Sequence, residues 1–323
     1  MKNKKRIVFL APETKGWPYF VYKDLVNWLK EKYWDELDVI FVNSKKNYFK
    51  LQFWLFWKID VLFSVIPFIF RPIWIKKYIY NPRWNFEIEK KKKNLWNKLL
   101  YFARNNLDFA DNIWLVSYFL ADKLYFRKKY EYKIKIIPNF INIDEYDFWE
   151  KKYDKEKFKI LTITSFKFYD KWKWIINLAK VISKLWKRTD KKIEWTIIWN
   201  DKSDNYKKIK KEFDKVSFKS NIIINWEWWC DKANIKEELK KNDYFLYWTF
   251  LDNFPNIILE AIASNMKVLV NDFESFKYFL NKKIICENEE EMVEKILEDK
   301  VDLTTISKFD KNSILDKIYT EIK

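Results

Sequence analysis

Two carboxylates stand eight residues apart in the segment LDNFPNIILEAIASNMKVLVND, residues 251–272. Asp252 lies in a loop-like stretch, and Glu260 lies inside the helical pattern that follows, beside small residues that let a helix pack closely on a sheet. Carboxylates placed across a loop and a helix start can face one site and accept hydrogen bonds from hydroxyl groups. A glutamate in an apolar helix needs a ligand or a structural lysine as its partner. The segment taken alone favours the lysine.

A basic segment, SFKFYDKWKWIINLAK at residues 165–180, is the second feature that could do chemistry. Lys167, Lys171 and Lys173 come directly before a helical pattern. The unpaired amides of a helix N-terminus, the helix dipole and nearby lysines can together bind a phosphate group. On the lysines alone, a solvated basic loop is the simpler interpretation.

The chain of 323 residues contains one glycine and 19 tryptophans, whereas an average frequency of roughly 7% predicts about 20 or more glycines. An α/β domain needs positive φ angles and close backbone approaches, which other residues supply poorly. We therefore hypothesise that many tryptophans are glycine in the native protein, because the source organism reads UGA as glycine. Glycine in place of Trp172 and Trp174 would let the loop backbone approach a phosphate that two indoles would crowd. Trp28, inside a helical pattern, is expected to be genuine.

The absence of histidine excludes Ser-His-Asp triads, Cys-His dyads and histidine metal sites. Cys230 and Cys286 lie far apart without CxxC spacing, so the sequence predicts a reduced, metal-free protein. The net charge of +17 favours an anionic partner, although an AT-rich genome enriches lysine without a functional reason. No apolar run reaches the roughly 20 residues of a spanning helix, and the first is too short for a signal peptide, so we expect a cytoplasmic protein.

Strand-like apolar runs alternate with helical patterns along the chain. Strands are expected at residues 6–13, 37–43, 59–68 and 110–117, and then at 158–166, 192–200, 221–226, 243–248 and 267–272. A polar, turn-rich stretch after Pro138 and Asn139 separates the two sets, so we predict domains at residues 1–150 and 151–323. Each set is typical of a doubly wound α/β domain, whose ligands bind at the carboxyl ends of the strands.

Four segments resemble, in order, parts of one enzyme family. The segment from Asp252 to Glu260, with Ala-x-Ala and a strand after it, resembles the carboxyl-terminal signature of retaining nucleotide-sugar glycosyltransferases of the GT-B fold, glycosyltransferase family 4. YDKWKWIINLAK is similar to their donor-phosphate loop, IIPNFINIDEYDF to the segment closing their first domain, and PETKGWPYFVYKDLVNWL to their first glycine-rich loop and helix. The resemblance spans most of residues 6–280 and implies two Rossmann-like domains facing a cleft.

The resemblance also implies roles for individual residues. Glu260 would hold the ribose hydroxyls of the nucleotide, Asp252 the transferred sugar, and the amides of Asn256 and Ile257 the diphosphate. Lys173, or Lys171 if the loop is aligned two residues earlier, would neutralise the leaving phosphate. Further donor contacts are implied at Lys167, Trp172, Trp174, Asn200, Trp226, Asn253 and Phe254, and the turn at Gly16 and Trp17 would face the cleft from the first domain.

The chain departs from the family pattern at several positions. Asp252 stands where glutamate is commoner, the phosphate loop has no arginine, and Asn265 replaces a glycine, which is tolerable because asparagine enters the left-handed region more readily than most residues. No histidine exists to fill the frequent histidine role of the first domain.

The expected activity is metal-independent, retaining transfer of a sugar from a nucleotide-diphosphate sugar to a glycan, lipid-linked or other acceptor, without a cofactor. The basic, aromatic region at residues 48–77 could dock the protein on the inner face of an anionic membrane. One alternative is a non-catalytic basic and aromatic protein that binds nucleic acid, which would explain the charge if the tryptophans are genuine. Another is a different GT-B enzyme, such as a nucleotide-sugar epimerase. The carboxylate pair favours the transferase, for which no nucleic-acid partner is expected.

Peptide mass spectrometry of the native protein across residues 165–230 tests the glycine hypothesis. We expect glycine at positions 172, 174, 199, 226, 228 and 229, because these loop and strand-exit positions make ordinary turns only with glycine. Tryptophan at these positions would contradict the hypothesis and would leave the phosphate loop sterically blocked.

Overall fold

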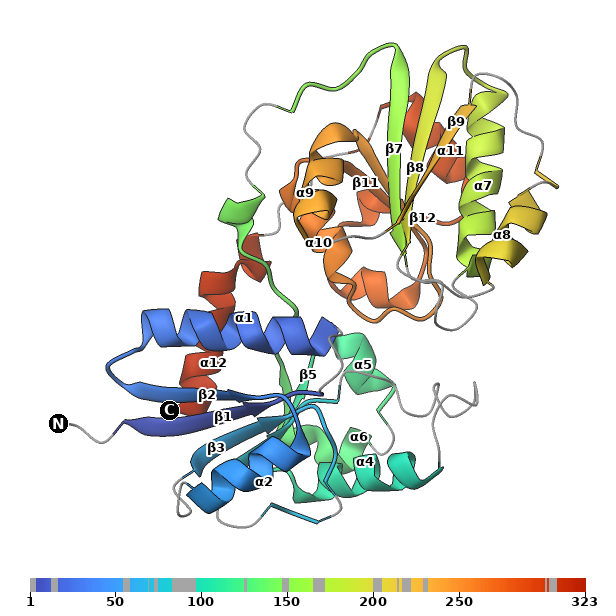
Figure 1. The fold of residues 1–323 in the computed structure, drawn as a ribbon. Coiled ribbons are helices and arrows are strands. Elements are labelled where there is room, and N and C mark those ends of the chain that lie inside the picture. The colour runs from blue at the N-terminus through green and yellow to red at the C-terminus, as the bar shows by residue number, and fades with distance from the viewer. Residues whose placement is uncertain are drawn as a thin grey trace. The chain divides into compact units, whose positions relative to one another are not determined.

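The protein is described here by a computed structural model, and Figure 1 shows its elements in chain order. The residues that the structure describes are 4–12, 17–54, 59–68, 70–72, 75–82, 97–124, 127–146, 151–164, 172–199, 205–213, 215–216, 222–228, 232–299, 301 and 307–323. The chain divides into two compact units, residues 1–138 with 312–323, and residues 139–311. Within the described ranges, no helix has both the length and the apolar character needed to cross a membrane.

Unit 1 is built on a parallel sheet with strand order β2-β1-β3-β4-β5-β6. Its strands are β1 (Lys5–Leu10), β2 (Leu37–Val42), β3 (Ile59–Ser64), β4 (Ile75–Tyr80), β5 (Asn112–Leu115) and β6 (Ile134–Ile136). Its helices are α1 (Trp17–Lys32), α2 (Lys45–Trp54), α4 (Asn97–Phe109), α5 (Tyr118–Asp122), α6 (Arg127–Tyr130), α12 (Lys311–Ile322) and the 3-10 turn η1 (Glu131–Lys133). Helices α1 and α12 cover one face of the sheet and α2 and α4 the other (Figure 1). Because helices cover both faces of the sheet, the sequences of its strands are mostly apolar. Ile7 to Leu10 of β1, for example, are fully buried.

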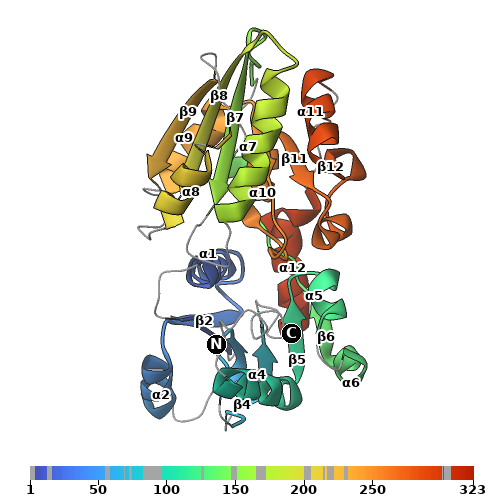
Figure 2. The same cartoon turned by 90° about the vertical axis from the view of Figure 1, so that its right-hand side faces the viewer.

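Unit 2 is built on a second parallel sheet, with strand order β12-β11-β10-β7-β8-β9. Its strands are β7 (Lys157–Thr164), β8 (Lys192–Trp199), β9 (Ile222–Trp228), β10 (Tyr244–Tyr247), β11 (Lys267–Asn271) and β12 (Ile285–Cys286). Its helices are α7 (Trp172–Trp186), α8 (Asn205–Phe213), α9 (Lys232–Lys241), α10 (Asn256–Ala263) and α11 (Glu289–Leu297), with 3-10 turns η2 (Ile143–Glu145), η3 (Glu274–Tyr278), η4 (Lys282–Ile284) and η5 (Ser307–Phe309). Figures 1 and 2 show α7, α8 and α11 on one face and α9 and α10 on the other.

The predicted fold class is confirmed, since each unit is a doubly wound parallel sheet and every predicted strand overlaps an observed one. In unit 2 the strand order reverses between β7 and β10. The two strands are neighbours, with Tyr244 opposite Ile160 and Phe245 opposite Leu161. The chain leaves β7 toward β8 and leaves β10 toward β11, so the connections after these strands diverge. Ligands of doubly wound sheets bind at such switch points, beyond the carboxyl ends of the strands.

Strand β4 is an element that the sequence pattern does not predict. Lys76 and Lys77 interrupt its apolar run, yet the strand pairs in parallel with β3. Both lysines find partners in the fold, because Lys76 Nζ lies 2.6 Å from Asp60 Oδ1 and Lys77 Nζ donates to the Glu321 carbonyl at 2.7 Å. The last three residues of β4 are fully buried.

The two units differ from the predicted domains at both ends of unit 2. Asn139 Nδ2 donates to the Phe254 carbonyl at 2.7 Å, and Lys311 N donates to the Ile141 carbonyl at 2.8 Å, so residues after Pro138 already belong to unit 2. These contacts are made by residues far apart in the sequence, so a local turn-rich stretch does not show them.

Helix α12 returns the end of the chain to unit 1. The rings of Tyr33 and Tyr319 stack with centroids 4.0 Å apart, and Lys5 Nζ donates to the Ile322 carbonyl at 2.6 Å. Four aliphatic side chains on one side of this helix are fully buried: Ile314, Leu315, Ile318 and Ile322. The first domain is therefore completed by the last residues of the chain.

Candidate functional site

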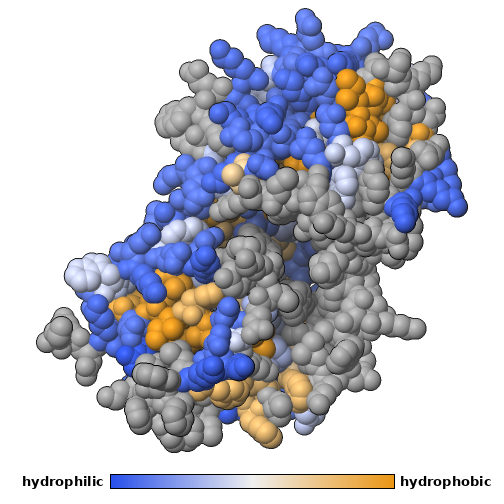
Figure 3. All heavy atoms as spheres, viewed as in Figure 1, coloured by the Kyte–Doolittle hydropathy of each residue, from blue (hydrophilic) through white to orange (hydrophobic). Residues whose placement is uncertain are grey.

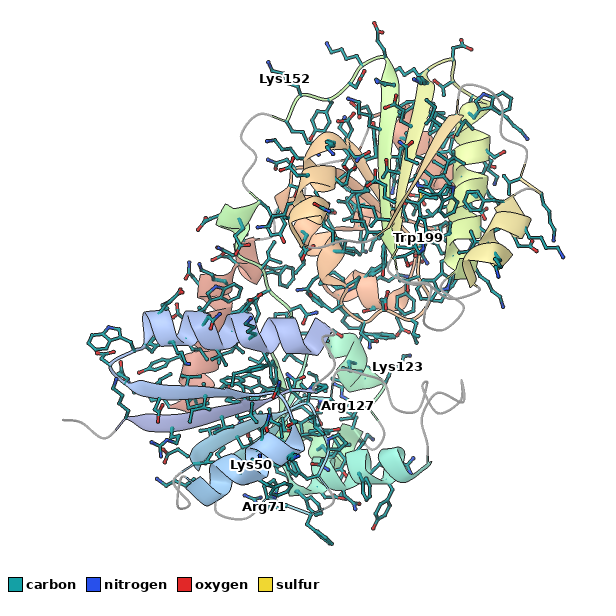
Figure 4. The ribbon with its side chains drawn as sticks, in the orientation of Figure 1. Lys50, Arg71, Lys123, Arg127, Lys152 and Trp199 are labelled. Carbon is teal, nitrogen blue, oxygen red and sulfur yellow. The ribbon has the colours of Figure 1, made fainter. Side chains whose placement is uncertain are left out.

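The carboxyl edge of the second sheet carries the loop that contains Asp252. Strand β10 ends at Tyr247, residues 248–255 form the loop, and α10 begins at Asn256. The neighbouring strand β7 ends at Thr164 on the same edge, and Trp199 marks the end of β8 there (Figure 4). The helices that follow β7 and β10 therefore begin at one edge, on opposite faces of the sheet.

A buried pair of polar residues holds the start of this loop. Thr249 N donates to Asn271 Oδ1 and Asn271 Nδ2 donates back to the Thr249 carbonyl, each at 2.8 Å. The Thr249 hydroxyl accepts from the amides of Leu251 at 3.2 Å and Asp252 at 3.1 Å. Thr249 and Asn271 are 0% and 2% exposed, so water competes little for these bonds. The loop after β10 is thus tied to the end of β11.

The carboxylate of Asp252 is held from within the sheet. The hydroxyl of Tyr247, the last residue of β10, donates a hydrogen bond to Asp252 Oδ2. Burial, together with the nearby charge of Asp252, raises the pKa of the Tyr247 phenol well above its usual value. Tyr247 therefore stays protonated and remains a hydrogen-bond donor. The side chain of Asp252 is partly exposed to solvent.

Two further loop residues are bound by side chains from separate segments. Asn139 Nδ2 donates to the Phe254 carbonyl at 2.7 Å, and the Ser275 hydroxyl donates to the Asn253 carbonyl. Phe254 is itself buried and stacks on Phe279 with ring centroids 4.1 Å apart. The loop is consequently fixed along its length.

Helix α10 begins without a side-chain cap. Pro255 stands at the N-cap position with φ −73° and ψ 122°, and it makes no side-chain hydrogen bond to the first turn. The amides of Asn256 and Ile257 form the N-terminal end of the helix, where the dipole favours an anion. The Asn256 side chain is 4% exposed, and its Nδ2 donates to the Phe140 carbonyl at 3.4 Å.

Glu260 lies in the second turn of α10 and is partly exposed, like Asp252. Ser264 anchors the end of this helix, since its hydroxyl and its amide donate to the Glu260 carbonyl at 2.8 and 3.0 Å. Asn265 follows with φ 54°, in the left-handed region, as expected for a residue in place of glycine. The helix can therefore turn sharply into β11.

The structure brings together six of the predicted donor-binding residues on one loop and helix: Asp252, Asn253, Phe254, Asn256, Ile257 and Glu260. Lys173 lies exposed in the first turn of α7, at the same edge of the sheet. Trp172 is the first residue of α7 and Trp17 the first of α1, but their side chains lie outside the described residues. Lys167, Lys171, Asn200 and Gly16 lie outside them entirely.

Two tryptophans predicted to contact the donor, Trp174 and Trp226, have different surroundings. Trp174 is buried in α7, with 6% of its side chain exposed. Trp226, in β9, is partly buried and packs edge-to-face against Trp199 and Phe213, with ring centroids 5.5 and 5.1 Å apart. These two indoles contribute to the core of unit 2 in this structure.

Sequence reasoning misses the residues that support the site, chiefly Tyr247, Thr249, Asn271 and Ser275. Polar side chains at the ends of buried strands are the available signal, because such groups need partners when they are buried. Their partners lie on other strands and cannot be read from spacing. In the part of the chain that the structure describes, no group of three acidic or cysteine side chains could hold a metal ion.

Solved structures with the same two-unit architecture cover almost the whole chain. WaaB, described as a lipopolysaccharide outer core galactosyltransferase, is 13% identical, with a TM-score of 0.65 and coverage of 98% of this chain and 99% of WaaB. HepE of Anabaena, in complex with UDP and glucose, is 12% identical, with a TM-score of 0.68 and the same coverage. Sucrose-phosphate synthase of Thermosynechococcus elongatus is 10% identical, with a TM-score of 0.68 and 98% of each chain covered.

These likenesses establish the fold. The chain has the GT-B fold. A scan against protein-family models and a search of curated proteins find no match.

Thr249→Val should destabilise the protein by about 1–3 kcal/mol, because the amides of Leu251 and Asp252 lose their acceptor while the side-chain shape is kept. Thr249→Ser retains the hydroxyl and is the matched control. Chemical unfolding of the three proteins measures the difference. Equal stability of the valine and serine variants would show that the hydroxyl does not hold the loop.

Proposed function

We propose that the protein is a glycosyltransferase of the hexosyl type, related to glycosyltransferase family 4, that uses a nucleotide-diphosphate sugar as donor. The observation that carries the proposal is the fixed loop and helix start that present Asp252 and Glu260 at the switch point of the second sheet. HepE, which shares the fold, has been solved with UDP and with UDP-glucose, and WaaB is described as a galactosyltransferase. These neighbours support a UDP-sugar donor.

The proposed reaction is metal-independent and retains the anomeric configuration. Transfer of the sugar leaves negative charge on the departing diphosphate, and groups fixed in advance around that charge lower the barrier most effectively. The amides of Asn256 and Ile257 at the start of α10 supply one such group, and Lys173 in the first turn of α7 supplies a positive charge. Lys167 and Lys171 would add to it.

The two carboxylates would recognise hydroxyl groups. An ionised carboxylate accepts hydrogen bonds and donates none, so it binds sugar hydroxyls well. Asp252 would orient the transferred sugar, and Glu260 the ribose of the nucleotide. Asn200, Trp226, Asn253 and Phe254 would complete the donor side, with glycine in place of several tryptophans.

Glu260→Ala should weaken donor binding about 10-fold or more, since a charge-assisted hydrogen bond contributes about 1.5–3 kcal/mol. Glu260→Gln keeps the size of the side chain and separates this loss from a packing defect. Lys283→Ala, at an exposed position of η4, should leave binding unchanged. Calorimetric titration with UDP and turnover of a panel of nucleotide sugars measure these effects, on protein with the residues that mass spectrometry identifies.

Binding of single-stranded RNA and analysis of the reaction product separate the alternatives. Salt-sensitive binding of single-stranded RNA that Glu260→Ala does not change, without turnover of any nucleotide sugar, would favour the nucleic-acid-binding function. A product in which the sugar is epimerised and not transferred would identify an epimerase.

The acceptor is proposed to be a glycan or a lipid-linked molecule, reached by a cytoplasmic protein at an anionic membrane. Three aromatic side chains of unit 1 stand well out of the surface: Phe49 is 56%, Phe70 76% and Tyr101 61% exposed. Lys50 and Arg71 lie at the lower edge of unit 1 (Figure 4), and they directly follow Phe49 and Phe70 in the sequence. Figure 3 shows hydrophobic atoms beside hydrophilic ones at this edge. Exposed aromatics next to basic side chains suit a negatively charged lipid surface.

Flotation with vesicles that contain anionic phosphatidylserine tests this membrane contact. The double variant with Phe70→Ser and Lys50→Glu should float clearly less than the unaltered protein, because it loses apolar contact and reverses a charge. Lys152→Glu, at an exposed position of unit 2, is the control for charge alone. Unaltered protein that stays with the soluble fraction would remove the membrane from the proposal.

A further inference from the structure

Tyr247 occupies a central and rigid position in the second sheet. Its strand, β10, pairs with β7 on one side and β11 on the other. The side chain is 4% exposed, and its ring packs near Phe245 and Phe276, with centroids 6.1 and 6.4 Å away. A ring enclosed in this way keeps one orientation, so its hydroxyl defines a fixed point at the edge of the strand.

The Tyr247 hydroxyl forms a hydrogen bond with one side chain of the loop, that of Asp252. The Tyr247 hydroxyl donates to Oδ2 of Asp252, five residues later in the chain. The Thr249 hydroxyl meanwhile accepts from the Asp252 amide at 3.1 Å. Asp252 is therefore held at its backbone and at its carboxylate by two side chains from the end of β10, and both of these are buried.

A structural role alone does not account well for this arrangement. A partly exposed aspartate can be solvated by water, so its carboxylate does not need the phenol as a partner, although the charge-assisted hydrogen bond adds stability. Fixing the plane of a carboxylate does matter where that carboxylate must meet a substrate hydroxyl, because small displacements of a binding group reduce rates strongly.

We propose that Tyr247 is a positioning residue that orients the carboxylate of Asp252 toward the sugar that is transferred. The inference rests on the proposed function and extends it, since it names the residue that sets the orientation of the Asp252 side chain. Tyr247 touches neither the nucleotide nor the sugar in this scheme. It acts only through Asp252.

The chain contains a matched control on the same strand. Tyr244, at the other end of β10, is 5% exposed and donates from its hydroxyl to Asp299 Oδ1 at 2.8 Å. Tyr244→Phe thus removes a tyrosine–aspartate hydrogen bond of the same kind, at the opposite end of the strand from the site. Any effect common to both phenylalanine variants reports on stability and not on positioning.

The experiment compares Tyr247→Phe and Tyr244→Phe in calorimetric binding of UDP and in steady-state turnover of the best nucleotide sugar. Tyr247→Phe should lower kcat about 10- to 100-fold, as expected for a misplaced binding group. It should change UDP affinity less than about twofold, because the nucleotide is held by α10 and Glu260. Tyr244→Phe should leave both quantities unchanged.

A double-mutant cycle with Asp252→Asn completes the test. In the Asp252→Asn background, Tyr247→Phe should have no further effect on kcat, since its only route of action is gone. Unchanged kcat in Tyr247→Phe, additive effects in the cycle, or equal losses in both tyrosine variants would each overturn the positioning role. Unaltered protein that neither binds UDP nor turns over any nucleotide sugar would overturn the proposed function first, and the role of Tyr247 with it.

Discussion

The reciprocal bond between Thr249 and Asn271 is the interaction on which the candidate site depends. Asn271 ends β11, Thr249 lies two residues after β10, and both carry polar groups that water does not reach, so each must find a protein partner. By pairing with each other they join the loop after β10 to the end of β11. The Thr249 hydroxyl then remains available to bind the amide of Asp252, and the position of the carboxylate follows from this bond.

The order of the strands explains why this loop lies where a ligand can bind. Strand β10 inserts beside β7, the first strand of its sheet, because the chain crosses to the far side after β9. Helices α7 and α10 consequently leave the same edge toward opposite faces. Two helix N-termini and their amides thus lie near one edge, on opposite faces of the sheet. A phosphate site and a carboxylate pair can share that edge because of the topology and not because of proximity in sequence.

Sequence reasoning predicts the elements that local patterns specify and misses those that depend on distant contacts. Apolar runs reveal most strands, whereas β4 is hidden because Lys76 and Lys77 are satisfied by Asp60 and by the last turn of α12. Helix α12 joins unit 1 through distant contacts such as the stacking of Tyr33 on Tyr319, which no local pattern shows. In the site, the spacing of Asp252 and Glu260 can be recognised in the sequence. Tyr247, at the end of a buried strand, cannot be told from an ordinary core residue.

The tryptophans show how a structure can refine a hypothesis that composition suggests. Trp195 is fully buried, stacks on Phe213 and donates its indole N–H to the Thr162 hydroxyl at 3.1 Å, as a genuine core tryptophan should. Trp248 instead buries an indole N–H that has no partner among the described residues. Such a group costs about 1–3 kcal/mol, and glycine would remove that cost. Since Trp248 directly follows β10, glycine there would also give the loop that carries Asp252 its most permissive residue at the point where it leaves the sheet.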